Sequence, residues 1–175
     1  MLLATPPCPV HVAGKRIVDR AGHVVYRDPG YSSLRAEIRC SGRTIWVVFH
    51  GGAASSQEAY VGVRSGDAGR TWRVVFAERY FGVRAPFELD AYSGPWTIAG
   101  SRAAYFTGWC PACGYGTVSL FVTADGGRTF RRYAIPALTG FRATAIRVSG
   151  DDVTVTARSS LRIGPRKKIV TVETR

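Results

Sequence analysis

The sequence predicts an all-β chain made of tandem antiparallel units, each with about four strands. Three observations support this prediction. Two eight-residue segments, 65–72 and 123–130, share the pattern Ser/Thr-x-Asp-x-Gly-x-Thr-aromatic, and each follows an apolar-rich run typical of a strand. A shift of 58 positions, which places Asp67 on Asp125, also aligns the surrounding strands without a gap. No long segment shows the 3.6-residue apolar period of an amphipathic helix.

The shared pattern predicts the tip of a β-hairpin. A short aspartate side chain accepts backbone N–H bonds a few residues further on, and the glycine supplies the positive φ of a tight turn. The threonine hydroxyl returns a hydrogen bond across the turn, and the aromatic residue starts the outgoing strand. The first turn contributes Ser65, Asp67, Gly69, Thr71 and Trp72 to this pattern, and the second contributes Thr123, Asp125, Gly127, Thr129 and Phe130.

The units extend well beyond the two turns. We place them at residues 34–80, 92–138 and 142–175, and each reads as strand, turn, strand, loop, strand, tight turn and strand. The third unit stops where its own tight turn would begin, because the position of Asp67 falls on Arg175. Together these units form one domain, 34–175, after an N-terminal segment, 1–33.

The N-terminal segment contains a predicted hairpin at residues 16–26. Two interpretations of this hairpin stay open. It is a plain lead-in hairpin, or it is a degenerate copy of the tight turn whose outgoing strand, 23–26, completes the third unit by pairing with residues 169–173. The first residues, 1–8, read as the remnant of a signal peptide or as an unstructured start.

The eight-residue pattern resembles the Asp-box, or BNR repeat, of sialidase-like β-propellers. This resemblance covers residues from about 34 onward and implies that each unit is a propeller blade. Closed propellers use about four to eight blades, whereas roughly three units fill this chain. Three explanations remain: a fragment of a longer product, a homodimer in which two chains complete one six-bladed ring, or a β fold that is not a propeller. Asp-box proteins include both enzymes and binding proteins, so the resemblance does not define an activity.

The composition allows a single domain of 175 residues with a real core, and no apolar run is long enough to cross a membrane. The net charge of +12 raises the possibility of an acidic partner, such as an anionic glycan or nucleic acid. However, the arginines are spread along the chain and no nucleic-acid-binding motif is present. Solvated edges and genomic bias therefore explain most of the charge, and polyanion binding is the weaker alternative.

The four cysteines are Cys8, Cys40, Cys110 and Cys113. We expect two disulfides, Cys110–Cys113 within a loop and Cys8–Cys40 between the N-terminal segment and the first unit. A thioredoxin-like redox pair at Cys110 and Cys113 is disfavoured because it needs a helix behind it. A zinc site using all four cysteines is also disfavoured because a second C-x-x-C is absent. We predict neither a metal nor a cofactor.

The resemblance also implies what a catalytic member would need. Enzymes of this superfamily use a Phe/Tyr-Arg-Ile-Pro motif, whose arginine binds the substrate carboxylate, together with two further arginines and acidic residues. Residues 83–86, Val-Arg-Ala-Pro, resemble this motif loosely and follow a tight turn instead of preceding the first one. The candidate catalytic residues are therefore Arg84 as carboxylate anchor, with Glu88 and Asp90 in acid and base roles.

Two loops of equal length, 50–59 and 108–117, form the most promising binding surface. They carry His50, Gln57, Glu58, Trp109 and Tyr115, which offer sugar stacking and hydrogen bonds to hydroxyl groups. We expect His50 to lie at the surface. The preferred prediction is an extracytoplasmic, non-catalytic binding or scaffold module for a carbohydrate or another protein. The alternative is a sialidase-like glycoside hydrolase.

Overall fold

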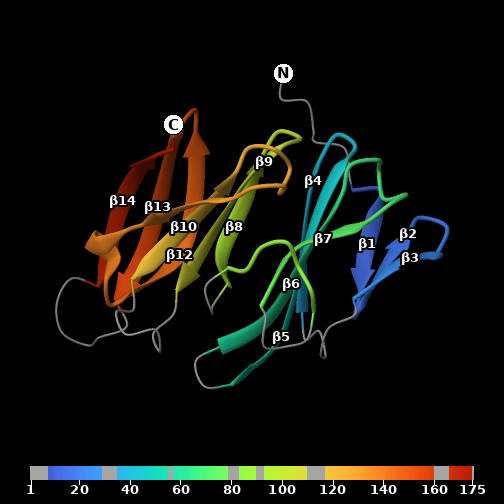
Figure 1. Cartoon of the computed structure of the whole chain (residues 1–175), viewed down its shortest axis with the longest axis horizontal. Helices are drawn as coiled ribbons and strands as arrows, with labels where there is room; N and C mark the ends of the chain where they lie inside the picture. Colours follow the sequence, from blue (N-terminus) through green and yellow to red (C-terminus); the bar gives the residue numbers. More distant parts are fainter. Residues whose placement is uncertain are drawn as a thin grey trace.

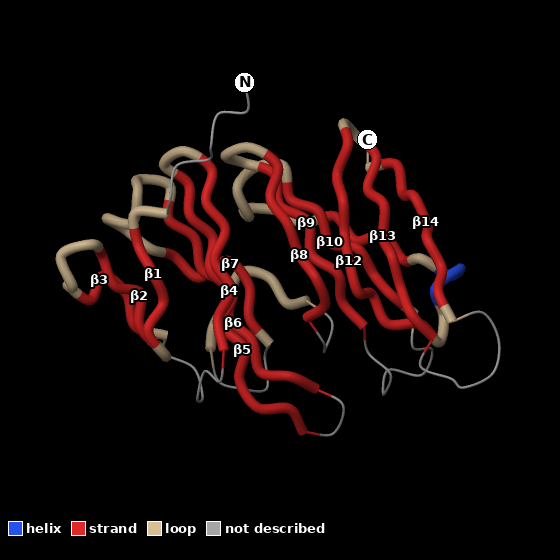
Figure 2. Tube along the Cα trace, turned by 180° about the vertical axis from the view of Figure 1, so that it is seen from behind, coloured by secondary structure: helices blue, strands red, loops and turns tan. Residues whose placement is uncertain are grey.

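A computed structural model describes residues 8–28, 35–54, 57–78, 83–89, 93–109, 117–159 and 166–174. Its strands form four antiparallel sheets, which follow one another in chain order as a row (Figures 1 and 2). The described residues contain no α-helix, only a short 3-10 helix, η3 (Pro136–Leu138). The all-β prediction is confirmed. In these ranges, no helix reaches the length and apolar character that crossing a membrane requires.

Each sheet is a simple meander of strands that are consecutive in the sequence. The first sheet contains β1 (Val10–Ala13), β2 (Arg16–Asp19) and β3 (Val24–Arg27). The second contains β4 (Arg35–Ser41), β5 (Thr44–Ala54), β6 (Gln57–Ser65) and β7 (Arg73–Ala77). The third contains β8 (Ser93–Ala99), β9 (Ala103–Trp109), β10 (Val118–Thr123) and β11 (Arg131–Ala134). The fourth contains β12 (Phe141–Ser149), β13 (Asp152–Ser159) and β14 (Lys167–Glu173).

The sheets correct two expectations about the organisation of the chain. The three expected units correspond to three of the sheets, the last with three strands instead of four, and residues before 34 add a further sheet in place of a lone hairpin. The proposed pairing of residues 23–26 with 169–173 is wrong, because β3 pairs with β2 and β14 pairs with β13. The hairpin at 16–26 is present, and β1 joins it as a third strand.

The first tight turn joins β6 to β7 through a dense set of local hydrogen bonds. The carboxylate of Asp67 accepts bonds from the backbone N–H of Thr71 at 2.9 Å, from the Thr71 hydroxyl at 2.7 Å and from the Ser65 hydroxyl at 2.7 Å. Gly69 has a φ of 92° and donates its N–H to the Ser65 hydroxyl at 2.8 Å. The bonds that Thr71 and Ser65 donate to Asp67 hold its pKa well below the ordinary value, since each one stabilises the ionised carboxylate.

The second tight turn, between β10 and β11, repeats this network. Asp125 accepts bonds from the N–H of Thr129 at 3.0 Å, the Thr129 hydroxyl at 2.7 Å and the Thr123 hydroxyl at 2.9 Å. Partial burial opposes ionisation of Asp125, but the hydrogen bonds outweigh it and hold its pKa well below the ordinary value. Gly127, with a φ of 81°, donates its N–H to the Thr123 hydroxyl at 2.7 Å.

A third turn of related chemistry joins β2 to β3. Asp19 accepts the N–H of Ala21 at 2.9 Å and the N–H of His23 at 2.8 Å, and the His23 ring lies 3.2 Å from the second carboxylate oxygen. His23 thus takes the place that the threonine holds in the other two turns. The aspartate network is therefore a local device that reverses the chain, and it tolerates another donor at its fourth following residue.

The hydrophobic core consists of three layers, one between each pair of neighbouring sheets. The layer between the second and third sheets contains Trp46, Phe76, Trp96, Phe106 and Phe121 among its buried residues. The other two layers lie between the first and second sheets and between the third and fourth. Since β5 lies in a sheet that is covered on both faces, its residues 45–50 are all buried, with alternate side chains entering opposite layers.

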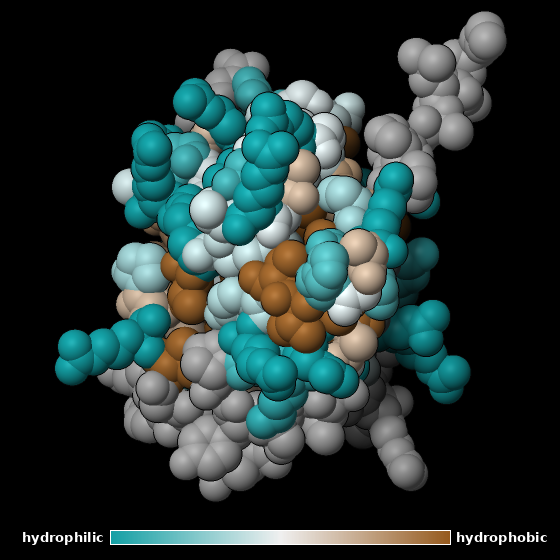
Figure 3. Space-filling model, turned by 90° about the vertical axis from the view of Figure 1, so that its right-hand side faces the viewer, coloured by the Kyte–Doolittle hydropathy of each residue, from teal (hydrophilic) through white to brown (hydrophobic). Residues whose placement is uncertain are grey.

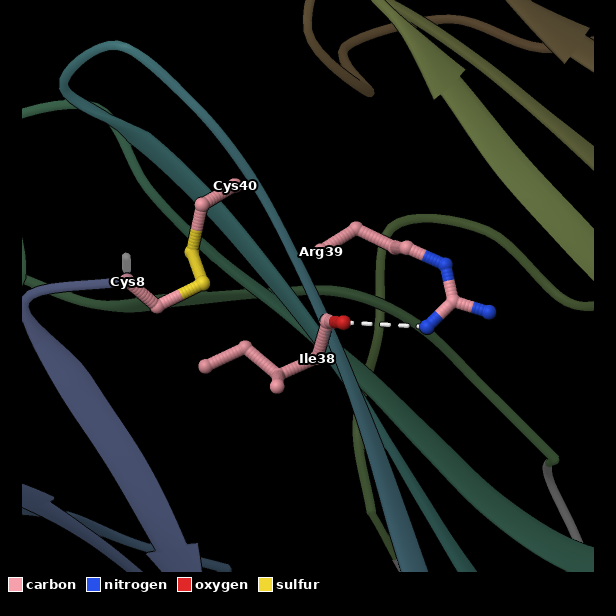
Figure 4. The surroundings of a disulfide bond; sticks show 4 residues. All are labelled: Cys8, Ile38, Arg39 and Cys40. Atoms are coloured by element: carbon pink, nitrogen blue, oxygen red, sulfur yellow. Dashed lines mark hydrogen bonds between the residues drawn. A yellow bond between two sulfur atoms is a disulfide. The ribbon is translucent and has the colours of Figure 1, made fainter. Parts of the chain in front are cut away.

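The first sheet is tied to the second by a disulfide between Cys8 and Cys40, whose α-carbons lie 5.7 Å apart (Figure 4). This pairing confirms one of the two expected disulfides, while Cys110 and Cys113 lie outside the described residues. The side of the molecule that carries the first sheet shows a small hydrophobic area bordered by hydrophilic side chains (Figure 3). Val24, on the edge strand β3, is 42% exposed.

Candidate functional site

The first strand of the second sheet presents a row of charged side chains. Side chains alternate along a strand, so Arg35, Glu37 and Arg39 share one face of β4. The opposite face carries Ile38 and Cys40, which pack in the layer toward the first sheet. Figure 4 shows Arg39 and Cys40 pointing to opposite sides of β4. The charged row therefore faces the third sheet, where Arg39 lies 4.9 Å from the ring of Trp96.

A buried histidine lies behind this row. His50 pairs with Arg35 across β4 and β5, and its side chain is only 1% exposed. Its Nδ1 lies 3.1 Å from Oε1 of Glu58, and its Nε2 lies 3.4 Å from Oε1 of Glu37. Arg35 contacts both carboxylates, at 3.4 Å from Glu37 and 3.8 Å from Glu58. We call these four residues, Arg35, Glu37, His50 and Glu58, the histidine cluster.

The electrostatics of the histidine cluster favour its fully ionised form. Burial opposes protonation of His50, but hydrogen bonds to Glu37 and Glu58 outweigh it and raise the pKa of His50 above its ordinary value. The hydrogen bond with His50 and the charges of Arg35 and Arg39 lower the pKa of Glu37. Glu37 is therefore a permanent acceptor near neutral pH and not a proton donor.

A pocket of about 390 Å³ opens beside the histidine cluster, where the first strands of three successive sheets meet. Its walls come from β4, β8 and β12, and they consist of Arg35, Glu37, Gly94, Pro95, Arg142, Ala143 and Thr144. Arg142 is exposed and, within the described part of the chain, pairs with no carboxylate. The pocket thus offers a positively charged group that its own protein leaves available.

Irregular strand geometry surrounds the pocket. The register shifts between Ser93 and Trp96 in β8, between Ala143 and Ala145 in β12, and between His50 and Ala53 in β5. Bulges of this kind redirect side chains and are common beside binding sites. The residues inside the first two shifts line the pocket itself, so the interruptions of the sheets and the pocket coincide.

The structure brings together only part of the predicted binding surface. The segment 50–59 is not a loop, because β5 extends to Ala54 and β6 begins at Gln57. His50 and Glu58 do meet, but His50 is buried, and the expectation of a surface histidine is wrong. The side chain of Gln57 is not described. Trp109 packs against the layer between the third and fourth sheets, apart from the histidine cluster, and Tyr115 lies outside the described residues.

The candidate catalytic residues do not form a site in the part of the chain that the structure describes. Segment 83–89 alternates inward and outward, with Phe87 and Leu89 packed toward the core and Arg84 and Glu88 exposed. Arg84 forms no ion pair with a carboxylate among the described residues. Asp90 lies outside them.

Comparisons with known proteins identify no relative of this chain, so the geometry of the site is the evidence for its role. No family model, no curated protein and no solved structure matches this chain. The sequence does carry one signal for the site, which prediction from motifs and loops misses. Arg35, Glu37 and Arg39 alternate along a single predicted strand, so their side chains share one face. In a sheet that neighbouring sheets cover, three charged side chains on one face are unusual and indicate a site.

Proposed function

We propose that this protein is a non-catalytic binding module and that the pocket between β4, β8 and β12 receives an acidic sugar. The observation that carries the proposal is that Arg142 and Arg35, from two different sheets, line the same pocket. Guanidinium groups match a carboxylate in shape and charge, and Glu37 accepts hydrogen bonds from sugar hydroxyls. The volume of about 390 Å³ falls at the lower end of the range for small-molecule sites.

The chemistry of the pocket favours binding over catalysis. Glycoside hydrolysis generally needs two carboxyl groups that flank the scissile bond, one of them protonated. Among the described residues that line the pocket, Glu37 is the single carboxylate, and its pKa is lowered. Glu58 lies behind His50 and is 13% exposed. We therefore place the sialidase-like alternative second, because the described residues offer no acid and base pair around a substrate.

We further propose that the four sheets are blades of an Asp-box propeller. Two features support this proposal. The tight turns repeat the same aspartate network, and the first strands β1, β4, β8 and β12 contact one another in chain order, as the innermost strands of successive blades would. Completion of a ring by a second copy stays a prediction. Light scattering tests it, since the dimer would have twice the 19.0 kDa mass of one chain.

An extracytoplasmic location belongs to the same proposal. The Cys8–Cys40 disulfide supports it, because disulfides persist mainly in oxidising compartments. An acidic polysaccharide outside the cell is then the expected class of ligand, and an uronic acid is its simplest unit.

Calorimetric titration with a trisaccharide of galacturonic acid tests the proposed ligand class. We expect binding of this sugar and much weaker binding of the neutral trisaccharide of galactose. Arg142→Gln should weaken binding of the acidic sugar about tenfold, the equivalent of one lost charge-assisted hydrogen bond. Arg147→Gln, which removes an exposed arginine of the same strand, is the matched control. Equal binding of both sugars, or an unchanged affinity in Arg142→Gln, would contradict the proposal.

A further inference from the structure

Four arginines gather at the junction of the second and third sheets, away from the residues that line the pocket. Arg64 is the last residue but one of β6 and Arg73 begins β7, and the two lie directly opposite each other in the sheet. Arg102 comes from the turn between β8 and β9, and Arg128 comes from the second tight turn. We call these four residues the arginine cluster.

The peptide groups around Gly126 hold this cluster together. The guanidinium of Arg73 donates a hydrogen bond to the carbonyl oxygen of Gly126. The N–H of Gly126 donates to the carbonyl of Arg102 at 2.9 Å, and Arg64 Nη2 donates to the carbonyl of Ser101 at 3.1 Å. A β-carbon at Gly126 would come within 3.0 Å of Arg64 Cζ, so the absence of a side chain makes room for this guanidinium.

The protein does not neutralise the charge of the arginine cluster. Within the described part of the chain, none of the four arginines forms an ion pair with a carboxylate. The nearby Asp125 uses its oxygens to accept bonds from Thr123, Thr129 and the backbone of Arg128. Burial and the charges of Arg73, Arg128 and Arg102 lower the pKa of Arg64.

Such an arrangement costs stability, because like charges directly opposite each other in a sheet repel. Arg64 adds a second cost, since its Nε is buried without a hydrogen-bond partner. Its guanidinium also lies over the buried ring of Trp46, at 5.7 Å from the ring centroid, and is thereby held in place. Arg73, Arg102 and Arg128 are exposed around it and remain accessible to an external anion.

We infer that the arginine cluster is a binding site for sulfate ester groups of a sulfated polysaccharide. Several guanidinium groups close enough to interact electrostatically suit a compact oxyanion with several acceptor oxygens. Nucleic acid is the less suitable polyanion, since single strands need exposed aromatic rings for base stacking. Among the described residues, every Phe, Tyr and Trp side chain is buried or half-buried.

Calorimetric titration with a heparin hexasaccharide at about 0.15 M NaCl, where exposed charges are screened beyond about 8 Å, tests this inference. The variant is Arg102→Gln with Arg128→Gln, because neither side chain makes a hydrogen bond to the described protein that folding would need. The control is Arg147→Gln with Arg158→Gln, which removes the same charge from exposed positions on β12 and β13. We expect affinity to fall at least about tenfold in the cluster variant and less than about twofold in the control.

Two outcomes would overturn the inference. Equal losses in the two double variants would show that heparin responds only to net charge. Competition by single-stranded DNA at the same charge concentration, as effective as that of heparin itself, would show a preference for a base-bearing partner. Retention of heparin binding in Arg142→Gln would support a site that is separate from the pocket.

Discussion

Gly127, in the second tight turn, packs directly against Val75 of the neighbouring sheet. A β-carbon at Gly127 would approach Cγ1 of Val75 to 2.2 Å and the ring of Trp46 to 2.9 Å. The first tight turn has the same relationship with the sheet before it, since a β-carbon at Gly69 would lie 2.9 Å from Val10. Each tight turn therefore joins two sheets in addition to reversing the chain.

This relationship predicts different costs for alanine at two glycines of similar conformation. Gly127→Ala should destabilise the protein by about 2–4 kcal/mol, because a left-handed backbone conformation and a steric clash add together. Gly100→Ala should cost about 1 kcal/mol, since Gly100 has a φ of 66° and nothing within 4 Å of the added methyl group. Urea denaturation measures both values. Equal costs would show that the turn does not pack against the neighbouring sheet.

The aspartates of the tight turns predict a specific loss of stability in acid. Their pKa values are lowered in the folded state, so their stabilising contribution is present above the unfolded value of about 3.9 and is lost as the pH falls toward the folded values. The double variant Asp67→Asn with Asp125→Asn should be less stable at pH 7 and lose less stability on acidification than the wild type.

Melting temperatures between pH 2 and pH 7 check this prediction. Asp152→Asn, at an exposed position that begins β13, is the control. If the double variant and the control depend on pH in the same way, the two turn aspartates are not the groups that respond to acid.

His50 predicts a second pH dependence, with the opposite sign. Its pKa is raised in the folded state, so the stabilisation from its charge is fully present below the unfolded value of about 6.5 and is lost as the pH rises through the folded value. His50→Gln should cost about 1–3 kcal/mol at pH 6, because the half-buried carboxylates of Glu37 and Glu58 lose their charged partner. Stability of this variant should change little between pH 6 and pH 9.

Nuclear magnetic resonance titration of the His50 ring checks the underlying pKa directly. A midpoint below about 6.5, the ordinary value, would show that burial outweighs the two carboxylates and would remove the proposed ion pairs of the histidine cluster.

The disulfide predicts a measurable contribution to stability. The variant Cys8→Ser with Cys40→Ser should be less stable by about 2–4 kcal/mol, because the bond links residues 32 positions apart and restricts the unfolded chain. The same variant isolates the other two cysteines. If Cys110 and Cys113 are bonded as expected, mass spectrometry after alkylation of the unreduced variant should find no free thiol.

The sequence predicts the local features of this fold well and its long-range features poorly. The tight turns are predictable because Asp67 and Asp125 bond to residues within their own short segments. The extension of β5 to Ala54 is not, because Gly51 and Gly52 have the composition of a loop. The two glycines lie in a register shift, and the pairing of Ala53 with Glu58 and of Ala54 with Gln57 continues the strand beyond them.

The pocket, too, is a long-range feature that the sequence does not predict. Arg35 and Arg142 belong to different sheets, and no spacing in the sequence indicates that β4 and β12 approach the same point. The resemblance to a catalytic motif instead predicts a role for Arg84, which lies in a segment whose side chains alternate between core and solvent. Burial of His50 could not be inferred from the sequence either, since it depends on the cover that the third sheet provides.

The most direct test of the proposed function follows the side-chain Nε signals of the arginines by nuclear magnetic resonance during titration with glucuronic acid. We expect that the signals of Arg35 and Arg142 shift and saturate, that the signal of Arg84 stays unchanged, and that glucose has no effect. A shift at Arg84 without one at Arg142, or equal shifts with glucose, would contradict the assignment of the pocket as an acidic-sugar site.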